Sequence, residues 1–533
     1  MSLAKSYDVV VIGSGGSGLT SALASSSQGA SVAVLEKGSK FGGSTSLSGG
    51  QLWIPNNGFQ KQVGIEDSKK MATKYLTRLA RGRVDHSLVD SFVRNSPKAL
   101  DFIVKRTPLR FAIRQGLPDY HPEWEGGLKG GRTLDPGLFD GRSLGDEYRT
   151  ILHNPQYHLP GGLHTTSLEF EMLMRGEEIP GLKDRKPSML ALGEALVGGL
   201  RKGLVDAGVP LFLSHGATRL VVEGGRVAGV EVNTPKGKKS VRAKRGVILA
   251  AGGFDWNLEM KKTYLSAPSE NSAGCLTDTG DGIAMGIGAG AATSLMDEAW
   301  WFTLILKPGE KRGWLSTSER TLPGSIVVNP KGKRFADEAQ NYVDLTRAML
   351  AHDPATYSFD NIPAYLVFDS AYLSKYPVAK DRKEEAQKWL VQGQTIMELA
   401  EKLGVDAGNL AQTVSEFNKN AEAGVDPEYH RGESAYDRHW GDPSAPNPTL
   451  GPLATPPFHG ARMLAGDIGT KGGITTDAVG RALDGLGEPI PGLYAVGNNA
   501  ASVMGPGYAG SGATLGPCLS FGYLAGLACV KSS

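Results

Sequence analysis

A tyrosine inside a glycine-rich loop is the first feature of this sequence that could do chemistry. Tyr508 lies in the stretch Gly505-Pro506-Gly507-Tyr508-Ala509-Gly510-Ser511-Gly512, where an aromatic ring has few neighbouring side chains to pack against. A phenol can donate a hydrogen bond to a developing oxyanion or, once ionised, accept a proton. Because an ordinary tyrosine pKa lies near 10, ionising one at pH 7 costs roughly 4 kcal/mol. A tyrosine base therefore needs a lowered pKa or an alkaline medium.

A second glycine-rich turn follows the first apolar run of the chain. The residues Gly13-Ser14-Gly15-Gly16-Ser17-Gly18 match G-x-G-x-x-G, and Glu36 closes the next apolar run. In this pattern Gly13 makes a tight turn, Gly15 lets a pyrophosphate approach the helix N-terminus, and Gly18 permits close packing of helix on strand. Glu36 can accept hydrogen bonds from ribose hydroxyls, which favours an unphosphorylated ribose. The turn predicts a dinucleotide site without separating NAD from FAD.

The elements that position these turns predict an α/β protein. Residues 7–36 read as strand, helix and strand, residues 210–253 as several short strands ending in a buried strand, and residues 492–496 as a further strand before a closing helix over 514–530. Charged, helical patterns dominate in between, as in 383–403 and 407–423. We therefore predict a discontinuous Rossmann-type domain, residues 1–294 and 467–533, interrupted by an α+β catalytic or capping domain, residues 295–466.

Composition excludes several classes of partner. Lysine and arginine number 57 against 55 acidic residues, and no basic run is interleaved with aromatics, so we expect no nucleic-acid binding. The three cysteines lack metal-ligand spacing, which favours a reducing compartment. The first apolar run leads directly into glycines, so we expect no signal peptide, and the most apolar stretches are shorter than a membrane span. We expect a cytoplasmic protein with at most peripheral membrane association. His121, His164 and His459 show no metal-site spacing, so we expect no metal.

Several further motifs resemble the fumarate reductase/succinate dehydrogenase flavoprotein superfamily. They are the small-residue loop 42–50 and the stretches 250–253, 279–282, 332–335 and 490–497, which together span essentially the whole chain. The resemblance implies FAD as the cofactor in a fold of the two-dinucleotide-binding type, with loop 42–50 beside the isoalloxazine. Membrane-bound members carry a histidine before the matching threonine for covalent attachment of the flavin. Here that residue is Ser44, so the FAD is expected to be non-covalent.

The glycine turn and this resemblance together predict the residues that contact FAD. Backbone N–H groups of the loop that opens the last helix are expected to stabilise negative charge at the flavin N1/C2=O edge. Asn498 and Asn499 stand where many relatives have Gly-Glu. The predicted contacts are Gly13, Ser14, Gly15, Gly16, Ser17, Gly18, Glu36, Lys37, Gly42, Gly43, Ser44, Thr45, Ser48, Gly49, Gly50, Ala217, Ala251, Gly252, Gly253, Asp281, Gly497, Asn498, Gly512, Thr514 and Leu515.

Within the superfamily, three separated segments resemble bacterial 3-ketosteroid Δ1-dehydrogenases. They are residues 119–127 with Tyr120, residues 323–342 with Tyr342, and residues 504–512 with Tyr508, although Ala509 stands where that family usually has proline. The resemblance implies that Tyr508 and the Gly512 N–H bind the ketone oxygen of a 3-ketosteroid. It also implies that Tyr342 removes the C2 proton, that Tyr120 hydrogen-bonds to Tyr342 and lowers its pKa, and that the C1 hydride passes to flavin N5.

Other functions stay open at this point. A 3-ketosteroid Δ4-(5α)-dehydrogenase would share the fold, but that family is associated with a serine two residues after the loop tyrosine, where this chain has Gly510. A fumarate-reductase-like enoate reductase needs arginine and histidine in segments 469–473 and 504–510, which lack them. A non-catalytic FAD module that senses redox state would not need three tyrosines. The sequence does not identify the electron acceptor.

Four aromatic residues are expected to form an apolar wall for the steroid: Trp300, Trp301, Phe302 and Trp314.

Overall fold

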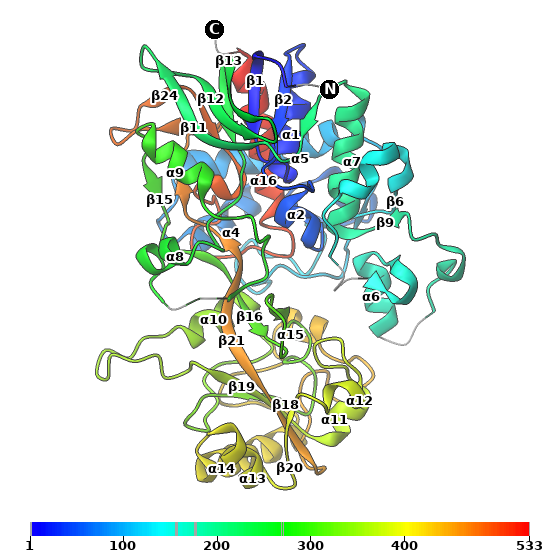
Figure 1. Ribbon diagram of the computed structural model, residues 1–533. Coiled ribbons are helices and arrows are strands. Elements are labelled where there is room, and N and C mark those ends of the chain that lie inside the picture. Colours follow the sequence, from blue (N-terminus) through cyan, green and yellow to red (C-terminus); the bar gives the residue numbers. More distant parts are fainter. Residues whose placement is uncertain (1–2, 155–157, 175–177, 268, 270, 532–533) are drawn as a thin grey trace.

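The computed structural model describes residues 3–154, 158–174, 178–267, 269 and 271–531. Figure 1 shows two parts, with the N- and C-terminal segments together in the upper part and the central segment forming most of the lower part. The upper part is built on an eight-stranded sheet in the order β10-β2-β1-β13-β12-β11, in which β24 also pairs with β13, and β23 pairs with β24. Its strands are β1 (Ser6–Ile12), β2 (Val32–Leu35), β10 (Leu211–Phe212), β11 (Gly216–Glu223), β12 (Arg226–Thr234), β13 (Gly237–Leu249), β23 (Arg481–Leu483) and β24 (Pro489–Ala495).

The centre of this sheet is parallel and buried. Val9, Val10 and Val11 of β1 are fully buried and pair in parallel with both β2 and β13, as an apolar run covered on two faces should. Strand β24 also runs parallel to β13, whereas β11 and β12 form an antiparallel extension. The α/β fold class predicted from the sequence is therefore confirmed.

Glycines bring the two ends of the chain into contact. Helices α1 (Gly16–Ser26) and α16 (Leu515–Lys531) pack against each other, as Figure 1 shows. A Cβ on Gly526 of α16 would lie 2.4 Å from the Ser21 carbonyl oxygen of α1, so only glycine permits this approach. At the first turn, a Cβ on Gly18 would lie 2.1 Å from the Gly13 carbonyl oxygen, which agrees with the packing role predicted for Gly18.

The remaining segments of the upper part surround these two helices. Helix α7 packs on both α1 and α2, and α5 packs on α16. The helices are α2 (Gly43–Leu47), α3 (Gly58–Gln62), α4 (Lys69–Ala80), α5 (His86–Arg106), α6 (Ser167–Met174), α7 (Leu192–Asp206), α8 (Leu258–Tyr264) and α9 (Asp281–Gly288). The short strands are β3 (Leu52–Trp53), β4 (Phe111–Ile113), β5 (Thr133–Pro136), β6 (Phe139–Asp140), β7 (His158–Leu159), β8 (Leu163–His164), β9 (Met189–Leu190), β15 (Thr293–Ser294) and β22 (Gly473–Ile474).

The lower part is a mostly antiparallel sheet with helices around it, in the order β17-β16-β21-β19-β18, and both β14 and β20 also pair with β21. The long strand β21 links the two parts (Figure 1). The strands are β14 (Asn271–Ser272), β16 (Ala299–Ile305), β17 (Trp314–Leu315), β18 (Ser325–Val328), β19 (Ala364–Phe368), β20 (Val391–Gly393) and β21 (Phe458–Thr470). The helices are α10 (Tyr342–Met349), α11 (Ser370–Lys375), α12 (Lys383–Ala386), α13 (Ile396–Leu403), α14 (Ala407–Glu422) and α15 (Ala435–Trp440).

One sequence prediction in this region is wrong and another stays a prediction. The helical pattern over 383–403 is not one helix, because residues 391–393 leave it to pair with β21 as strand β20. Gly393 permits the turn back, since a Cβ there would lie 2.5 Å from the Leu399 nitrogen. The domain boundaries at 295 and 466 stay predictions. The lower sheet extends beyond them, since it includes β14 and the last residues of β21.

Among the described residues, no helix combines the length and the apolar character needed to cross a membrane. The expectations of a cytoplasmic location and of at most peripheral membrane association stay predictions.

Candidate active site

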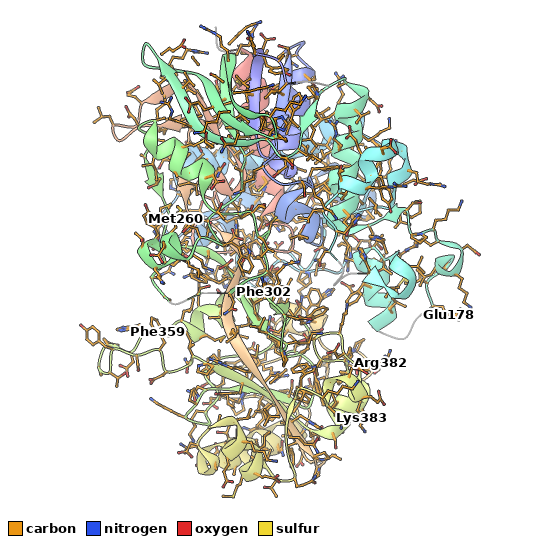
Figure 2. The ribbon with its side chains drawn as sticks, in the orientation of Figure 1. Glu178, Met260, Phe302, Phe359, Arg382 and Lys383 are labelled. Carbon is orange, nitrogen blue, oxygen red and sulfur yellow. The ribbon has the colours of Figure 1, made fainter. Side chains whose placement is uncertain are left out.

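A single elongated cavity of about 380 Å3 runs from the first glycine turn to the junction of the two parts. Figure 2 places Phe302, which lines the cavity, at this junction. One end is bordered by the turn after β1 and by Glu36, and the other by tyrosines and by residues of β16 and β17. The cavity therefore joins the predicted dinucleotide site to the predicted catalytic tyrosines.

At the dinucleotide end, Glu36 is held in place through hydrogen bonds. Ser14 donates to the Glu36 Oε2 atom from its hydroxyl at 2.6 Å and from its N–H at 3.2 Å, and the Gly38 N–H donates to Oε1 at 2.7 Å. These contacts fix a carboxylate at the cavity wall directly after β2. Such a carboxylate is placed to accept hydrogen bonds from ribose hydroxyls, as the sequence predicted.

Lys37 and Asp281 also border the cavity and bind each other. The Lys37 Nζ atom donates to Asp281 Oδ2 at 2.7 Å and to Thr279 Oγ1 at 2.6 Å. This ion pair joins the end of β2 to the first turn of α9. Both side chains are partly exposed, so solvent screens the pair and its contribution to stability is small.

Most of the predicted FAD contacts lie on the cavity wall. Those that line it are Gly13, Ser14, Gly15, Ser17, Glu36, Lys37, Gly43, Ser44, Thr45, Ser48, Gly49, Gly50, Ala217, Ala251, Gly252, Asp281, Asn498, Gly512, Thr514 and Leu515. Five predicted contacts lie behind the wall instead: Gly16, Gly18, Gly42, Gly253 and Gly497. A Cβ on any of these five would approach another atom to within 3.0 Å. Close packing of the surrounding chain therefore explains why these positions are glycine.

Ser44 lies where a covalently attached flavin would need a histidine, and its hydroxyl is engaged by the protein. It donates to Asp278 Oδ2 at 2.7 Å and accepts from the Cys275 N–H at 2.7 Å. Burial raises the pKa of Asp278 to about 7. The next residue, Thr45, accepts a hydrogen bond on Oγ1 from the Gly16 N–H at the start of α1. Loop 42–50 is thus fixed to both α1 and the segment after β13.

These residues fit an adenine dinucleotide such as FAD. The turn after β1 presents the N-terminus of α1 to the cavity, which suits a pyrophosphate. A Cβ on Gly15 would meet no atom closer than Thr45 Oγ1 at 3.6 Å, so its backbone faces open space that a phosphate can approach. Glu36 stands at one side of this turn for a ribose, and the small residues of loop 42–50 border the cavity for a flat ring system.

The three predicted catalytic tyrosines come together at the other end. Tyr120 donates a hydrogen bond to the Tyr342 hydroxyl oxygen at 2.6 Å, and their ring centroids lie 5.3 Å apart. The Tyr508 ring lies 5.1 Å from that of Tyr120 and 5.7 Å from that of Tyr342. Phe302 stacks on Tyr342 at 3.8 Å. All three tyrosines line the cavity although the chain separates them widely.

Burial sets the acidity of this cluster. It raises the pKa of Tyr342 and of Tyr120 well above the ordinary tyrosine value, and it raises the pKa of Tyr508 as well. The hydrogen bond from Tyr120 is present, but burial first and then the neighbouring tyrosines raise the pKa of Tyr342, so the expectation of a lowered pKa is not met. A neutral Tyr508 is the form that can donate a hydrogen bond.

Tyr508 and Gly512 lie in one loop with two possible donors. The Tyr508 hydroxyl is 2.9 Å from Thr514 Oγ1. Gly512 has a φ of +91°, and a Cβ there would lie 2.5 Å from the Gln51 carbonyl oxygen, so glycine is required. Its N–H makes no hydrogen bond to any residue that the structure describes, and Gly512 borders the cavity. The N–H is therefore available to a ligand.

The predicted aromatic wall is only partly right. Phe302 and Trp314 line the cavity, whereas Trp300 and Trp301 do not. Trp300 supports the site from behind, with its ring 4.9 Å from that of Tyr508 and its Nε1 donating to Asn498 Oδ1. Trp301 is buried and donates to Glu298.

Sequence reasoning missed several residues of the site. Tyr436 of α15 packs its ring 5.0 Å from that of Tyr120, and Trp440 of the same helix lines the cavity. Lys471 is buried under the Tyr508 loop, and His215 and Asp278 border the dinucleotide end. Only Lys471 left a signal, as a lysine within a glycine-rich segment. The others are brought in by long-range packing that no local pattern reveals.

Comparison with known proteins places the chain in a family. A family model for an FAD binding domain matches residues 8–515. The chain is 42% identical over 553 residues to the 3-oxosteroid 1-dehydrogenase of Mycobacterium tuberculosis (strain ATCC 25618 / H37Rv), with 98% of each chain covered. It is 38% identical over 537 residues to the 4-oxocyclohexanecarboxylate 2-dehydrogenase of Sinomonas cyclohexanicum, covering 98% of this chain and 92% of that protein.

The fold agrees with these similarities. The crystal structure of 3-ketosteroid Δ1-dehydrogenase from Sterolibacterium denitrificans, in complex with 1,4-androstadiene-3,17-dione, superposes with a TM-score of 0.93 at 36% identity. The match covers 99% of this chain and all of that one. The predictions of FAD as cofactor and of the family are thereby confirmed, whereas the roles of individual residues stay predictions. The chain belongs to the FAD-binding domain family and, within it, to the family of the 3-oxosteroid 1-dehydrogenases.

Proposed function

We propose that this protein is an FAD-dependent 3-ketosteroid Δ1-dehydrogenase, which introduces a double bond between C1 and C2 of the steroid A ring. The observation that carries the proposal is the convergence of Tyr120, Tyr342 and Tyr508 with the Gly512 N–H at one end of the cavity whose other end fits FAD. The full-length relatives with this activity in their names support it.

Tyr508 and Gly512 bind the ketone oxygen. A C–H bond beside a ketone becomes acidic only when negative charge that develops on the oxygen is stabilised. Two donors, the Tyr508 hydroxyl and the Gly512 N–H, would supply this stabilisation inside a cavity shielded from water. Burial favours their neutral state, because it raises the pKa of Tyr508. In this role Thr514 Oγ1, 2.9 Å from the Tyr508 hydroxyl, keeps the phenol oriented.

Tyr342 accepts the proton from C2. Its oxygen receives the Tyr120 hydrogen bond at 2.6 Å, and such a bond stabilises the phenolate. The raised pKa of Tyr342 leaves little phenolate at neutral pH. The enzyme should therefore turn over faster in alkaline solution. FAD, when bound, supplies the oxidant that accepts the hydride from C1.

The FAD is held without a covalent bond. No histidine occurs in loop 42–50, and the Ser44 hydroxyl is used in hydrogen bonds to Asp278 and Cys275. Fixed contacts from Glu36, the α1 N-terminus and loop 42–50 account for retention of the cofactor.

Two features favour the Δ1 reaction on a steroid. A serine at position 510, associated with Δ4-(5α)-dehydrogenases, would not fit, because a Cβ there would lie 2.7 Å from Trp53 Cδ1. Beyond Tyr342 the cavity continues along Phe302, Trp314 and Leu315. These three apolar side chains offer the fused rings of a steroid more contact than the smaller substrate named for the Sinomonas relative would use.

Lys471 holds the loop that carries Tyr508. Its Nζ atom donates to the Pro506 and Gly507 carbonyl oxygens at 2.8 and 2.7 Å and lies 4.6 Å from the Trp300 ring, which in turn contacts Tyr508. Burial lowers the pKa of Lys471 to about 7, and a neutral amine can still donate both hydrogen bonds. Lys471 is therefore a positioning residue.

Release of the cofactor tests the non-covalent attachment. Acid precipitation of the purified protein should leave all flavin absorbance in the supernatant. Yellow colour that stays with the pellet after repeated extraction would show a covalent link elsewhere in the chain.

The change Tyr342→Phe tests the base. It removes the proton acceptor while the ring stays stacked on Phe302, so kcat should fall at least about 100-fold and steroid affinity should change little. In the wild type, kcat should rise with pH through the neutral range, because the pKa of Tyr342 is raised. Steady-state rates from pH 6 to 10 measure both effects. A variant that keeps more than a tenth of the rate, or keeps the pH rise, would assign the base elsewhere.

The change Lys471→Met tests the support of the loop. Two buried carbonyls lose their donor, so kcat/KM should fall about tenfold or more while FAD is retained. Because the folded pKa lies below the ordinary 10.5, the unfolded chain binds a proton that the folded chain lacks between about pH 7 and 10.5. The Tm advantage of wild type over Lys471→Met should therefore grow as pH rises through this window. Lys402→Met, which removes an exposed donor to the Gln392 carbonyl, is the matched control. Equal effects of the two changes would remove Lys471 from the site.

Product analysis tests the reaction itself. With an artificial electron acceptor, androst-4-ene-3,17-dione should lose two hydrogens and give the 1,4-diene, and a saturated 5α-3-ketosteroid should first give the 1-ene. NMR resolves the products. If androst-4-ene-3,17-dione does not react and the saturated steroid gives a 4-ene, the protein is a Δ4 enzyme. If the protein converts 4-oxocyclohexanecarboxylate but neither steroid, the proposed substrate class is wrong, although the proposed dehydrogenation beside a ketone would still hold.

A further inference from the structure

A cluster of three histidines and a glutamate lies beside α7, apart from the tyrosines. His153 Nδ1 is 2.6 Å from Glu194 Oε2, and His158 Nε2 is 2.9 Å from Glu194 Oε1. His164 Nε2 lies 4.0 Å from Glu194 Oε2. Two nitrogen ligands and a carboxylate therefore converge on one point, with a third imidazole next to them.

Local structure explains why these side chains meet. Strands β7 and β8 form a short antiparallel pair that sets His158 directly opposite His164, with ring centroids 4.1 Å apart. Glu194 lies in the first turn of α7 and is buried, and the Asn154 N–H donates to its Oε1 atom at 2.9 Å. That hydrogen bond orients the carboxylate in the way that supporting groups orient metal-binding carboxylates.

The donor set suits a divalent first-row transition ion. Imidazole nitrogens with one carboxylate are typical ligands of Zn2+, at about 2.0–2.2 Å from the ion, so that tetrahedral ligands lie about 3.3 Å apart. The ligand atoms of His153, His158 and Glu194 all lie within 4.8 Å of one another. Shifts of about an ångström would bring them to coordination distance. Side chains of His153 and His158 are partly exposed, which gives an ion a path of entry.

We propose that His153, His158 and Glu194 form a binding site for a divalent transition metal ion such as Zn2+, with His164 as a further ligand. This replaces the expectation of no metal, which rested on the absence of a familiar spacing in the sequence. The site depends on no part of the proposed dehydrogenase reaction.

Two hydrogen bonds join the proposed metal site to loop 42–50. Beside Glu194, the Gly193 N–H donates to the Ser48 carbonyl oxygen at 3.0 Å. Beside His153, the Asn154 side chain donates to the Leu47 carbonyl oxygen at 2.7 Å. An ion at this point would fasten the segment that contains β7 and β8 to α7 and support loop 42–50 from behind. Its role is structural, and loading should raise the Tm of the FAD-bound protein.

Zinc titration of the FAD-bound protein tests the proposal. After dialysis against a chelator and its removal, isothermal titration with Zn2+ at neutral pH should show one site per chain. In the double variant His153→Ala/His158→Ala, that site should be lost or its Kd raised at least 100-fold, with the flavin spectrum unchanged. Affinity should also fall as the solution is acidified, because protons compete for the imidazole nitrogens.

The matched control is His430→Ala, which removes an exposed histidine paired with Glu433 on the surface. It should bind Zn2+ as the wild type does. Anomalous diffraction at the zinc edge from soaked crystals should place the ion among His153, His158 and Glu194. Zinc binding by the double variant equal to that of wild type, no binding by the wild type, or an anomalous peak elsewhere would overturn the site and leave the histidines as ion-pair partners of Glu194.

Discussion

The site depends on a close backbone contact between residues 51–53 and the glycine loop 510–516. The Trp53 N–H donates to the Gly512 carbonyl oxygen at 3.1 Å, and a Cβ on Gly512 or Gly516 would lie within 2.5 Å of the facing main chain. Through its indole N–H, Trp53 also donates to Asp119 at 2.7 Å, the residue before Tyr120. Trp53 thus fixes three segments relative to each other: residues 51–53, which directly follow loop 42–50, the Tyr508 loop and the Tyr120 segment. Without glycine at these positions the donors at Gly512 and Tyr508 could not face the cavity.

Burial has opposite consequences for the roles proposed for Tyr508 and Tyr342. It keeps Tyr508 protonated, which a hydrogen-bond donor requires, and it strengthens the donated bond by excluding water. The same burial raises the pKa of Tyr342 and so opposes its proposed role as a base. Tyr120 donates a hydrogen bond to the Tyr342 oxygen at 2.6 Å. The pocket therefore favours stabilisation of the oxyanion over easy formation of the phenolate.

The sequence predicted what local patterns and motifs encode. The turn 13–18, Glu36, the buried strands of the upper sheet and the closing helix were found because glycine turns and apolar runs have direct physical meaning. Tyr342 and Tyr508 were placed by resemblance. Tyr436, Asp278 and the His153 cluster were not found, because contacts between distant segments bring them to their neighbours. The helical pattern over 383–403 forms helices at its two ends but is interrupted at residues 391–393, because pairing with β21 overrides helical propensity there.

The most direct test of the account is an anaerobic reaction of the FAD-bound protein with androst-4-ene-3,17-dione that carries two deuterium atoms at C1. If the C1–C2 bond is dehydrogenated at this site, the flavin should bleach in proportion to the steroid converted, and the 1,4-diene product should retain one deuterium at C1. Unbleached flavin at saturating steroid, or a product that retains both deuterium atoms at C1, would contradict dehydrogenation of the C1–C2 bond at this site.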